Sequence, residues 1–236
     1  MDELAGAYAT TLILFAIAAV LVFAGLRPDP RDVGKEVAKQ YPSEIPHGEA
    51  RPILQILRQP AAVTAVAAMM LGQVVMVAIM VITSLHMEDH QHARADIYTV
   101  ISAHTFGMFA PSIISGWLLD KIGRGRMIFI GSFTLLLSCI TAPLSPNVLP
   151  LGISLFLLGA GWNFCFVGGS TLLSDQLSPV ERSRTQGTSD FLVGLASAII
   201  SLSSYTMMAV IAGILALVPL FMAWSYMRGT RMQVQM

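Results

Sequence analysis

Long runs of apolar residues alternate with short polar segments along the chain. Seven of these runs approach the roughly 20 residues that a helix needs to cross a bilayer core of about 30 Å. The runs are too long for membrane-spanning strands and lack the apolar and polar alternation of such strands. The pattern therefore predicts an all-α, polytopic helical membrane protein with about seven transmembrane helices, at residues 4–26, 61–85, 97–119, 127–144, 151–173, 191–204 and 205–227.

The last two runs leave two interpretations open. Residues 190–227 give only 38 positions for two crossings and the turn between them, so the first crossing would be short. A single long bent helix is the alternative, but it would put Arg228 and Arg231 on the outer side. We favour two shortened spans joined near residues 201–206, because the charge rule then holds. The join resembles a place where the outer end of a helix and the loop after it have been lost.

Composition supports a membrane protein and excludes several other classes. Apolar residues make up 55% of the chain and charged residues 12%, with a mean hydropathy of +0.69, whereas an ordinary soluble domain is about 25% charged. The net charge is zero, so we expect no nucleic acid partner. Cys139 and Cys165 both lie inside apolar runs, which argues against a disulfide framework or a thiol metal site. We expect no cofactor.

The distribution of basic residues predicts the topology. The first run begins after Asp2 and Glu3 and is followed by cations, unlike a signal peptide, so we place the N-terminus outside. Alternation then puts 13 of the 14 Lys and Arg residues on the cytoplasmic side, as the positive-inside rule requires, with Arg94 the exception. The cytoplasmic segments are 27–58, 120–126, 174–189 and 228–236. We expect a multi-pass protein of the plasma membrane.

Polar residues inside the runs mark where a solute or proton pathway is sought, because ionisable groups are costly there and usually face the bundle interior. His104 lies seven residues into the third run, about 10 Å deep at ~1.5 Å per residue. It is the first candidate for a substrate or proton role. Gln73 in the second run and Asn163 beside Trp162 in the fifth follow it. The alternative for each is a hydrogen bond between helices.

Two other polar positions have simpler interpretations. Asp190 stands at the expected start of the sixth span, where it suits an N-cap or a charge in the first turn. In the outer segment at residues 86–96, His86 and His90 have the i, i+4 spacing that can bring two imidazoles together. Nothing completes a set of ligands there, and solvated loop histidines are the alternative, so we predict no metal site.

Residues 116–127, GWLLDKIGRGRM, form a dense charge cluster between two apolar runs. A short basic turn can simply anchor two helix ends at the inner membrane face. The order of residues is more specific, because G-x-L-x-D-[RK]-x-G-R-[RK] resembles the loop signature of the major facilitator superfamily. Gly125 stands where the family usually has a third adjacent cation. The matching positions are Gly116, Leu118, Asp120, Lys121, Gly123, Arg124 and, one place late, Arg126.

This resemblance extends over essentially the whole chain. The superfamily has twelve helices in two six-helix halves, with signature loops after helices two and eight and a long cytoplasmic linker between the halves. Residues 27–58, with five prolines and mixed charge, resemble that linker, and the signature falls after the second run that follows it. The resemblance implies that residues 1–26 correspond to helix six, residues 59–227 to the C-terminal six-helix bundle, and residues 228–236 to a cytoplasmic tail.

The resemblance also implies roles for the loop. Gly116 and Gly123 allow close backbone approach and a tight turn. Asp120 can neutralise cations or face the N-terminal end of a helix, and Arg124 can bridge to carboxylates. In the family this aspartate latches the outward-facing state against a helix of the opposite half. Residues 174–187 resemble the charged inner loop between helices ten and eleven.

The implied function is transport of a small solute by alternating access, in which two bundles rock about a central site. One bundle has nothing to rock against, so we expect a truncated C-terminal half that needs the missing N-terminal half or a second copy. The other partners are the lipid bilayer and an unidentified solute, with proton coupling as an option. The alternatives are a non-transporting binding or regulatory module and an inactive remnant. No catalytic motif is present, and we expect no enzyme.

Overall fold

The structure, a computed structural model, describes residues 3–40, 50–201 and 205–234, and every regular element that they form is helical. The expected all-α fold is confirmed. The chain divides into two compact units, Met1–His47 and Gly48–Met236. In chain order the helices are α1 Glu3–Gly25, α2 Pro30–Gln40, α3 Ile53–Ile56, α4 Pro60–Asp89, α5 Arg94–Phe109, α6 Ser112–Ile122, α7 Arg124–Thr141, the 3-10 turn η1 Ala142–Leu144, α8 Val148–Ser174, α9 Pro179–Ser201 and α10 Tyr205–Val234.

The first unit contains an apolar helix followed by a polar one. α1 coincides with the first expected apolar run to within a residue at each end. α2 lies in the segment expected to be a linker and is amphipathic. Its exposed ion pair between Lys39 Nζ and Glu36 Oε2, 3.2 Å long, contributes little stability because water competes for both charges.

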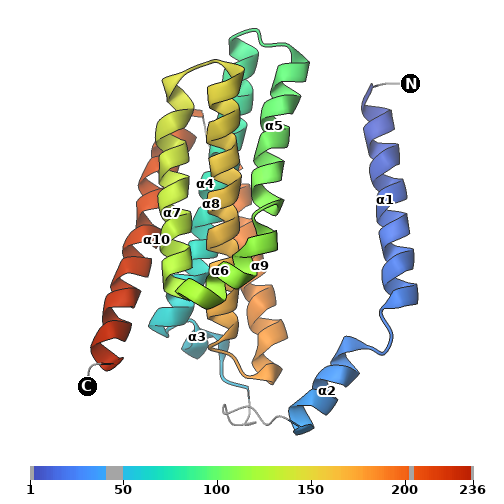
Figure 1. Cartoon of the computed structure of the whole chain (residues 1–236), viewed down its shortest axis with the longest axis vertical. Helices are drawn as coiled ribbons and strands as arrows, with labels where there is room; N and C mark the ends of the chain where they lie inside the picture. The colour runs from blue at the N-terminus through green and yellow to red at the C-terminus, as the bar shows by residue number, and fades with distance from the viewer. Residues whose placement is uncertain (1–2, 41–49, 202–204, 235–236) are drawn as a thin grey trace. The chain divides into compact units, whose positions relative to one another are not determined.

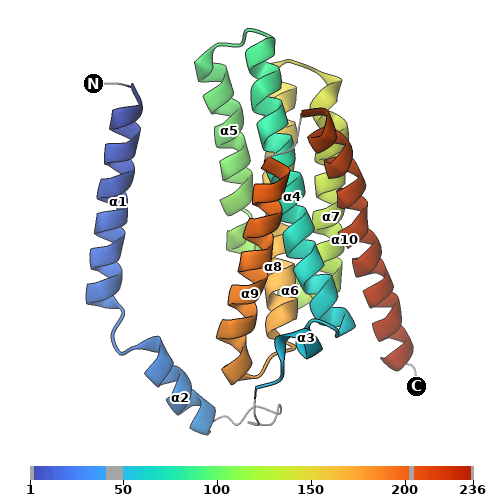
Figure 2. The ribbon, with the colours of Figure 1, turned by 180° about the vertical axis from the view of Figure 1, so that it is seen from behind.

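α8 is the central helix of the second unit. It packs against α4, α5 and α7, and α10 packs against α4 and α7 on the outside (Figures 1 and 2). α9 packs mainly against α4. Two clusters of buried apolar side chains fill these interfaces, one containing Val75 and Leu155 and the other Met69 and Leu173.

Small residues let the helices around α8 approach one another closely. A Cβ atom at Gly159 would lie 2.3 Å from the backbone oxygen of His104, and one at Gly107 would lie 2.3 Å from the backbone oxygen of Phe156. Gly161 also lies close to α7, where a Cβ would be 2.8 Å from the nearest backbone nitrogen. Only glycine fits at these positions, as is usual where membrane helices associate through backbone contact.

The third expected span is a bent pair of helices rather than one rod. α5 ends at Phe109 and α6 begins at Ser112, with an angle of 41° between them. Pro111 lies at the break, where it removes a backbone donor and stops the helix from continuing.

The start expected for the sixth span lies twelve residues after the start of the helix in the structure. α9 starts at Pro179 and not at Phe191, so most of the expected inner loop at residues 174–189 is helical. Asp190 is therefore in the middle of a helix, where its Oδ1 accepts a hydrogen bond from Gln186 Nε2 at 3.0 Å. The expected N-cap role of Asp190 was wrong. α10 runs back from the far end of the bundle (Figure 2); residues 202–204, at the expected lost segment, lie outside the described residues.

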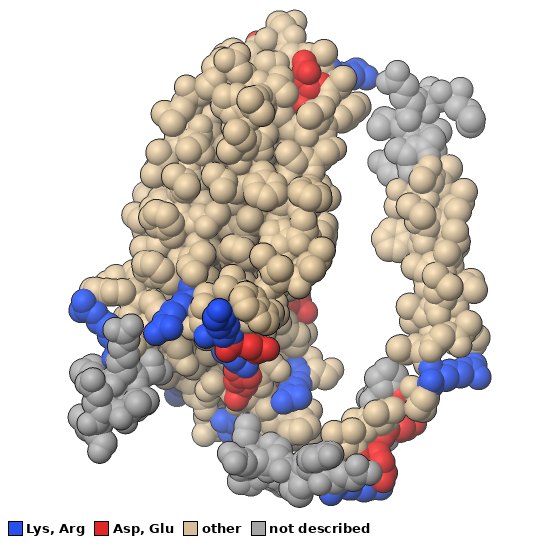
Figure 3. Space-filling view, in the orientation of Figure 1, with Lys and Arg blue, Asp and Glu red and all other residues tan. Residues whose placement is uncertain are grey.

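Three helices in the described ranges are long and apolar enough to cross a membrane, namely α4, α7 continued through η1, and α8; the bent α5 and α6 pair makes a fourth. The described parts of α1 and α10 provide shorter apolar stretches, Ala9–Gly25 and Ile214–Arg228. α9 carries charged residues through its first half. In the second unit, Lys and Arg gather at one end, below a broad face of uncharged residues (Figure 3).

Candidate functional site

The charged hairpin between α6 and α7 is held by one arginine. Gly123 makes the turn with φ at +88°, a backbone conformation that favours glycine, and so confirms the expected tight turn. Arg124 Nε lies 2.8 Å from Asp175 Oδ2 at the end of α8, and Arg124 Nη1 lies 3.7 Å from Asp120 Oδ1. The hairpin is thus tied both to its own helix α6 and to α8.

These ion pairs are exposed to solvent. The side chains of Asp120 and Asp175 are 78% and 43% exposed, and that of Arg124 is 33% exposed. Pairs of this kind are worth about 0–1 kcal/mol, so they can form and break at little cost. A carboxylate as open as Asp120 is available to a second partner.

The remaining hairpin residues have different environments. Gly116 is exposed, and a Cβ atom added to it would have no described atom within 4 Å, so within this chain it makes no close approach. Gly125 is buried, and a Cβ there would lie 3.1 Å from the Tyr226 ring of α10. The Lys121 ammonium lies 4.8 Å from the centre of the Trp117 ring. Arg126 is exposed at the start of α7.

A second charged contact is buried at the same end of the bundle. Glu181 in the first turn of α9 is only 2% exposed, and Arg51 binds it with two parallel bonds, Nε to Oε1 and Nη2 to Oε2, both 2.8 Å. The backbone nitrogens of Arg51 and Ser178 also donate to this carboxylate, at 2.9 and 3.0 Å. Arg51 Nη2 reaches the carbonyl of Gln176 at 2.8 Å, and Arg184 donates to the carbonyl of Arg51. We call this set of contacts the Arg51–Glu181 clamp.

The clamp changes the acidity of both groups. Hydrogen bonds from Arg51 hold the pKa of the Glu181 carboxyl far below its ordinary value, while burial opposes the shift less strongly. The same hydrogen bond raises the pKa of Arg51. The clamp therefore stays charged at any physiological pH, and it fastens the segment before α3 to the base of α9.

Sequence reasoning missed the partners Asp175, Arg51 and Glu181. A signal for one of them was present, because Ser178, Pro179 and Glu181 form the S-x-x-E pattern that begins a helix, with proline at its first position. Recognising it would have placed the start of α9 correctly. Arg51 is 130 residues away in the sequence, and no local pattern indicates a contact over that separation.

Asn163 on α8 supports the break between α5 and α6. Its Nδ2 donates to the Met108 carbonyl and to Ser112 Oγ, both at 2.8 Å, and its Oδ1 accepts from Ser115 Oγ at 2.7 Å. Asn163 is 4% exposed. The amide thus replaces hydrogen bonds that the helix loses near Pro111, which corresponds to the structural alternative weighed for this residue.

His104 is buried between α5 and α8. It is 2% exposed, and its Nδ1 lies 3.1 Å from the Leu155 carbonyl, so Nδ1 carries a hydrogen and donates it to that oxygen. Nε2 is buried and has no hydrogen-bond partner among the described residues.

Gln73 and Trp162 meet between α4 and α8. Trp162 Nε1 donates to Gln73 Oε1 at 2.6 Å, and the Trp162 ring stacks on Phe166 with centres 5.1 Å apart. All three residues are half-buried, which leaves part of this face open. Ser170 and Ser174 continue the same face of α8, since each follows at a spacing of four residues.

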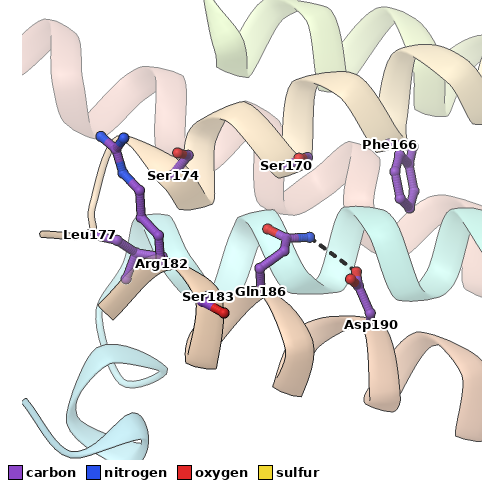
Figure 4. A pocket seen from close by; sticks show the side chains of 8 residues that line it. All are labelled: Phe166, Ser170, Ser174, Leu177, Arg182, Ser183, Gln186 and Asp190. Carbon is purple, nitrogen blue, oxygen red and sulfur yellow. Dashed lines mark hydrogen bonds between the residues drawn. The ribbon is translucent and has the colours of Figure 1, made fainter. Parts of the chain in front are cut away.

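A cavity of about 420 Å³ adjoins the lower part of this face (Figure 4). α8 and α9 form its walls, and the Gln186 to Asp190 hydrogen bond lies on the α9 side. Its lining residues are Phe166, Ser170, Ser174, Leu177, Arg182, Ser183, Gln186 and Asp190.

At the opposite end, α4 continues into the expected outer segment at residues 86–96 and ends at Asp89. His86 and His90 are together, as their spacing predicts, with ring centres 4.1 Å apart. His90 Nδ1 is 2.9 Å from the His86 carbonyl. No group of three or more His, Cys, Asp or Glu side chains suited to a metal occurs among the residues that the structure describes.

Apolar helices packed through glycines, with a charged hairpin at one end, define a multi-pass helical membrane protein. A family model described as Major Facilitator Superfamily matches residues 4–201, and the chain belongs to this family. It is 34% identical over 229 residues to the uncharacterized MFS-type transporter YdeG and 33% identical over 229 residues to YddS, both of Bacillus subtilis; each match covers 92% of this chain and 53% or 52% of the relative. The riboflavin transporter RfnT of Brucella anthropi is 32% identical over 147 residues, 62% of this chain and 37% of that protein.

The chain therefore spans about half the length of the curated relatives that it matches over most of its own length. Membership confirms the family resemblance drawn from the hairpin. It also confirms the expectation of a transporter-family protein and not an enzyme.

Proposed function

We propose that the chain is the C-terminal half of an alternating-access carrier for a small solute, preceded by the last helix of the N-terminal half. Family membership and the chain's share of its relatives' length support this assignment. So does the position of the signature hairpin, which follows the second helical span after the polar segment at residues 27–58. The proposal includes a cytoplasmic location for the hairpin and the C-terminus and an outer location for the N-terminus.

The observation that carries the proposal is the placement of Arg124 between Asp120 and Asp175. An exposed, low-cost ion pair at the base of a bundle can be remade when another bundle approaches, which alternating access requires. Exposed Gly116, one turn before Asp120, leaves room for a helix of that second bundle. We propose that the second bundle is an N-terminal half or another copy of this chain.

The solute would contact the open face of α8. Gln73 and Trp162 offer an amide and an aromatic ring near the middle of the helices, and Phe166, Ser170 and Ser174 continue the face to the cavity beside α9. His104 is the candidate for proton coupling, because its Nε2 is buried without a described partner. Asn163 would act by holding the bent span beside this path.

Reconstitution tests the proposal. The chain would be placed in vesicles alone, and also as a fusion in which it replaces the matching 229-residue segment of YdeG. Riboflavin, named for one relative, and a panel of small organic anions and cations would be the solutes. In at least one of these two forms we expect solute flux above that of empty vesicles. Asp120→Asn should abolish this flux, and Asp89→Asn, a matched change in the outer segment, should retain it.

The alternatives give different outcomes. Saturable solute binding without flux in either form would favour a non-transporting binding or regulatory module. Neither binding nor flux from a correctly folded fusion would favour an inactive remnant. Topology is tested separately by cysteine labelling, with Ser145→Cys expected to react with an impermeant reagent from outside and Ser183→Cys only after permeabilisation. The reverse pattern would overturn the proposed orientation.

A further inference from the structure

Asp190 differs in position from the other charged residues of the second unit. It lies at the centre of α9, eleven residues from each end of that helix. Every other Asp, Glu, Lys and Arg within the described helices α4 to α10 lies within two turns of a helix end. An ionisable group so far from a helix end is costly in a membrane protein, and it usually serves the pathway of a solute or an ion.

The carboxylate of Asp190 is not neutralised within the described part of the chain. Its Oδ1 accepts the 3.0 Å hydrogen bond from Gln186, and none of the ion pairs among the described residues includes Asp190. The side chain is exposed in this chain, so water solvates it. When a second bundle closes over this cavity, as the proposed carrier requires, that water would be lost and an unpaired carboxylate would be costly. A positively charged partner would remove this cost.

The other charged group of the cavity lies at its opposite end. Arg182 precedes Asp190 by eight residues on α9, which corresponds to about 12 Å along the helix axis. Figure 4 shows its side chain directed away from Asp190, toward the Ser174 end of the cavity. The cavity is therefore anionic at the end where it reaches furthest along α8 and cationic at the end where α8 stops.

Aromatic rings of α8 lie at the anionic end. Phe166 lines the cavity at the same end as Asp190 (Figure 4). Trp162, one turn further along α8, stacks on Phe166, and both rings are half-buried, so part of each remains open. Aromatic faces attract ammonium groups, most strongly where water is excluded. A carboxylate on one helix and aromatic rings on the next suit a positively charged organic group between them.

We propose that Asp190 and Phe166 bind the positively charged nitrogen of an organic cation. This inference rests on the proposed carrier function and names the class of its solute. The carboxylate supplies the counter-charge, and Gln186 holds its Oδ1, which leaves Oδ2 for the ligand. The rings of Phe166 and Trp162 contact the ammonium group and the apolar part beside it. A cavity of about 420 Å³ has the size of a site for a small organic molecule.

Binding of two aromatic probes of opposite charge tests the proposal on the full chain in a non-ionic detergent. Phenyltrimethylammonium is the cation and benzenesulfonate the anion, and equilibrium dialysis gives the dissociation constant of each. We expect saturable binding of phenyltrimethylammonium that is tighter than that of benzenesulfonate. Asp190→Asn should weaken binding of the cation on the order of tenfold, because the counter-charge is lost. Phe166→Leu should weaken it about threefold.

Two further variants serve as controls. Asp190→Glu keeps the negative charge and should retain most of the affinity for phenyltrimethylammonium. Asp89→Asn makes the same change in the outer segment and should bind the cation as the wild-type chain does. No saturable binding of phenyltrimethylammonium to the wild-type chain would overturn the proposal. Equal losses in Asp190→Asn and Asp89→Asn would also overturn it, because they would show a general effect of surface charge.

Solute flux, measured separately, distinguishes this inference from the carrier function. Flux together with wild-type binding of phenyltrimethylammonium by Asp190→Asn would overturn the cation site and leave the carrier function standing. Binding that depends on Asp190 without any flux would support the site and contradict the carrier function. Loss of that binding in the YdeG fusion would show that a cation of the second bundle pairs with Asp190, and it would overturn the assignment to the solute.

Discussion

Removing one side of the Arg51–Glu181 clamp should destabilise the protein. In Arg51→Gln, the carboxylate of Glu181, which is 2% exposed in the wild-type chain, loses two 2.8 Å bonds from the guanidinium. Breaking a buried ion pair in this way costs about 3–5 kcal/mol. The Arg51 side chain is 31% exposed and the two backbone N–H groups still donate, so we expect about 2–3 kcal/mol.

Thermal unfolding of the full chain in detergent measures this loss. Cys139 and Cys165 are free and lie within the bundle, so a thiol-reactive dye reports when the core opens. A loss of 2–3 kcal/mol corresponds to a fall of roughly 5–10 °C in the unfolding midpoint for a domain of this size. Arg182→Gln, which removes a nearby exposed arginine, should change the midpoint by less than about 2 °C.

A double-mutant cycle isolates the pair. Arg51→Gln/Glu181→Gln removes both charges, so it should be more stable than Arg51→Gln, in which the buried carboxylate is unpaired. A wild-type unfolding midpoint for Arg51→Gln, or simple addition of the two single losses in the double variant, would contradict a stabilising role for this pair.

Two other contacts and the pH dependence of the clamp also lead to measurable outcomes. Gly159→Ala should destabilise the chain by more than about 2 kcal/mol, since its Cβ would meet the backbone of α5 at 2.3 Å, whereas Gly152→Ala, with open space around it, should be neutral; equal unfolding midpoints would contradict this. Asn163→Leu should raise hydrogen exchange of amides at the α5–α6 break on the order of tenfold, and unchanged exchange would argue against its supporting role. Because the pKa of Glu181 is lowered on folding from its ordinary 4.5, its stabilisation is complete above that pH and lost as pH falls below it. The stability difference between wild type and Glu181→Gln should therefore shrink below about pH 4.5. A stability difference that grows as the pH falls would contradict this prediction.

Most of the helical pattern could be predicted from the sequence because apolar periodicity and length are local properties. The helix corresponding to residues 61–85 and that corresponding to residues 151–173 each contain the expected run in full. The start of α9 was misplaced because hydropathy alone was followed through a segment whose capping residues, Ser178 and Glu181, were the better guide. Charged residues outside an apolar run are no evidence against a helix.

The contacts of the candidate site were predicted less completely. The signature order correctly singled out Arg124 as a bridge between carboxylates, but Asp175, its nearer partner, lies 51 residues away. Asn163 was noticed as a polar residue in a span, and its purpose depends on a break at Pro111 that hydropathy does not reveal. Pairings between distant segments are set by tertiary packing, which a single sequence does not encode locally.

Glycine contacts around α8 also determine which parts of the second unit can deform. Where backbones touch without intervening side chains, no change of rotamer can absorb a shift, so α4, α5, α7 and α8 must travel as one stiff block. The parts that can move more easily are the end of α6 beyond Ser115, the last residue that Asn163 holds, and α9 beyond the clamp. If the proposed transport cycle operates, distances measured by spin or fluorescent labels between α4 and α7 should stay constant, while distances from α8 to the far end of α6 should change.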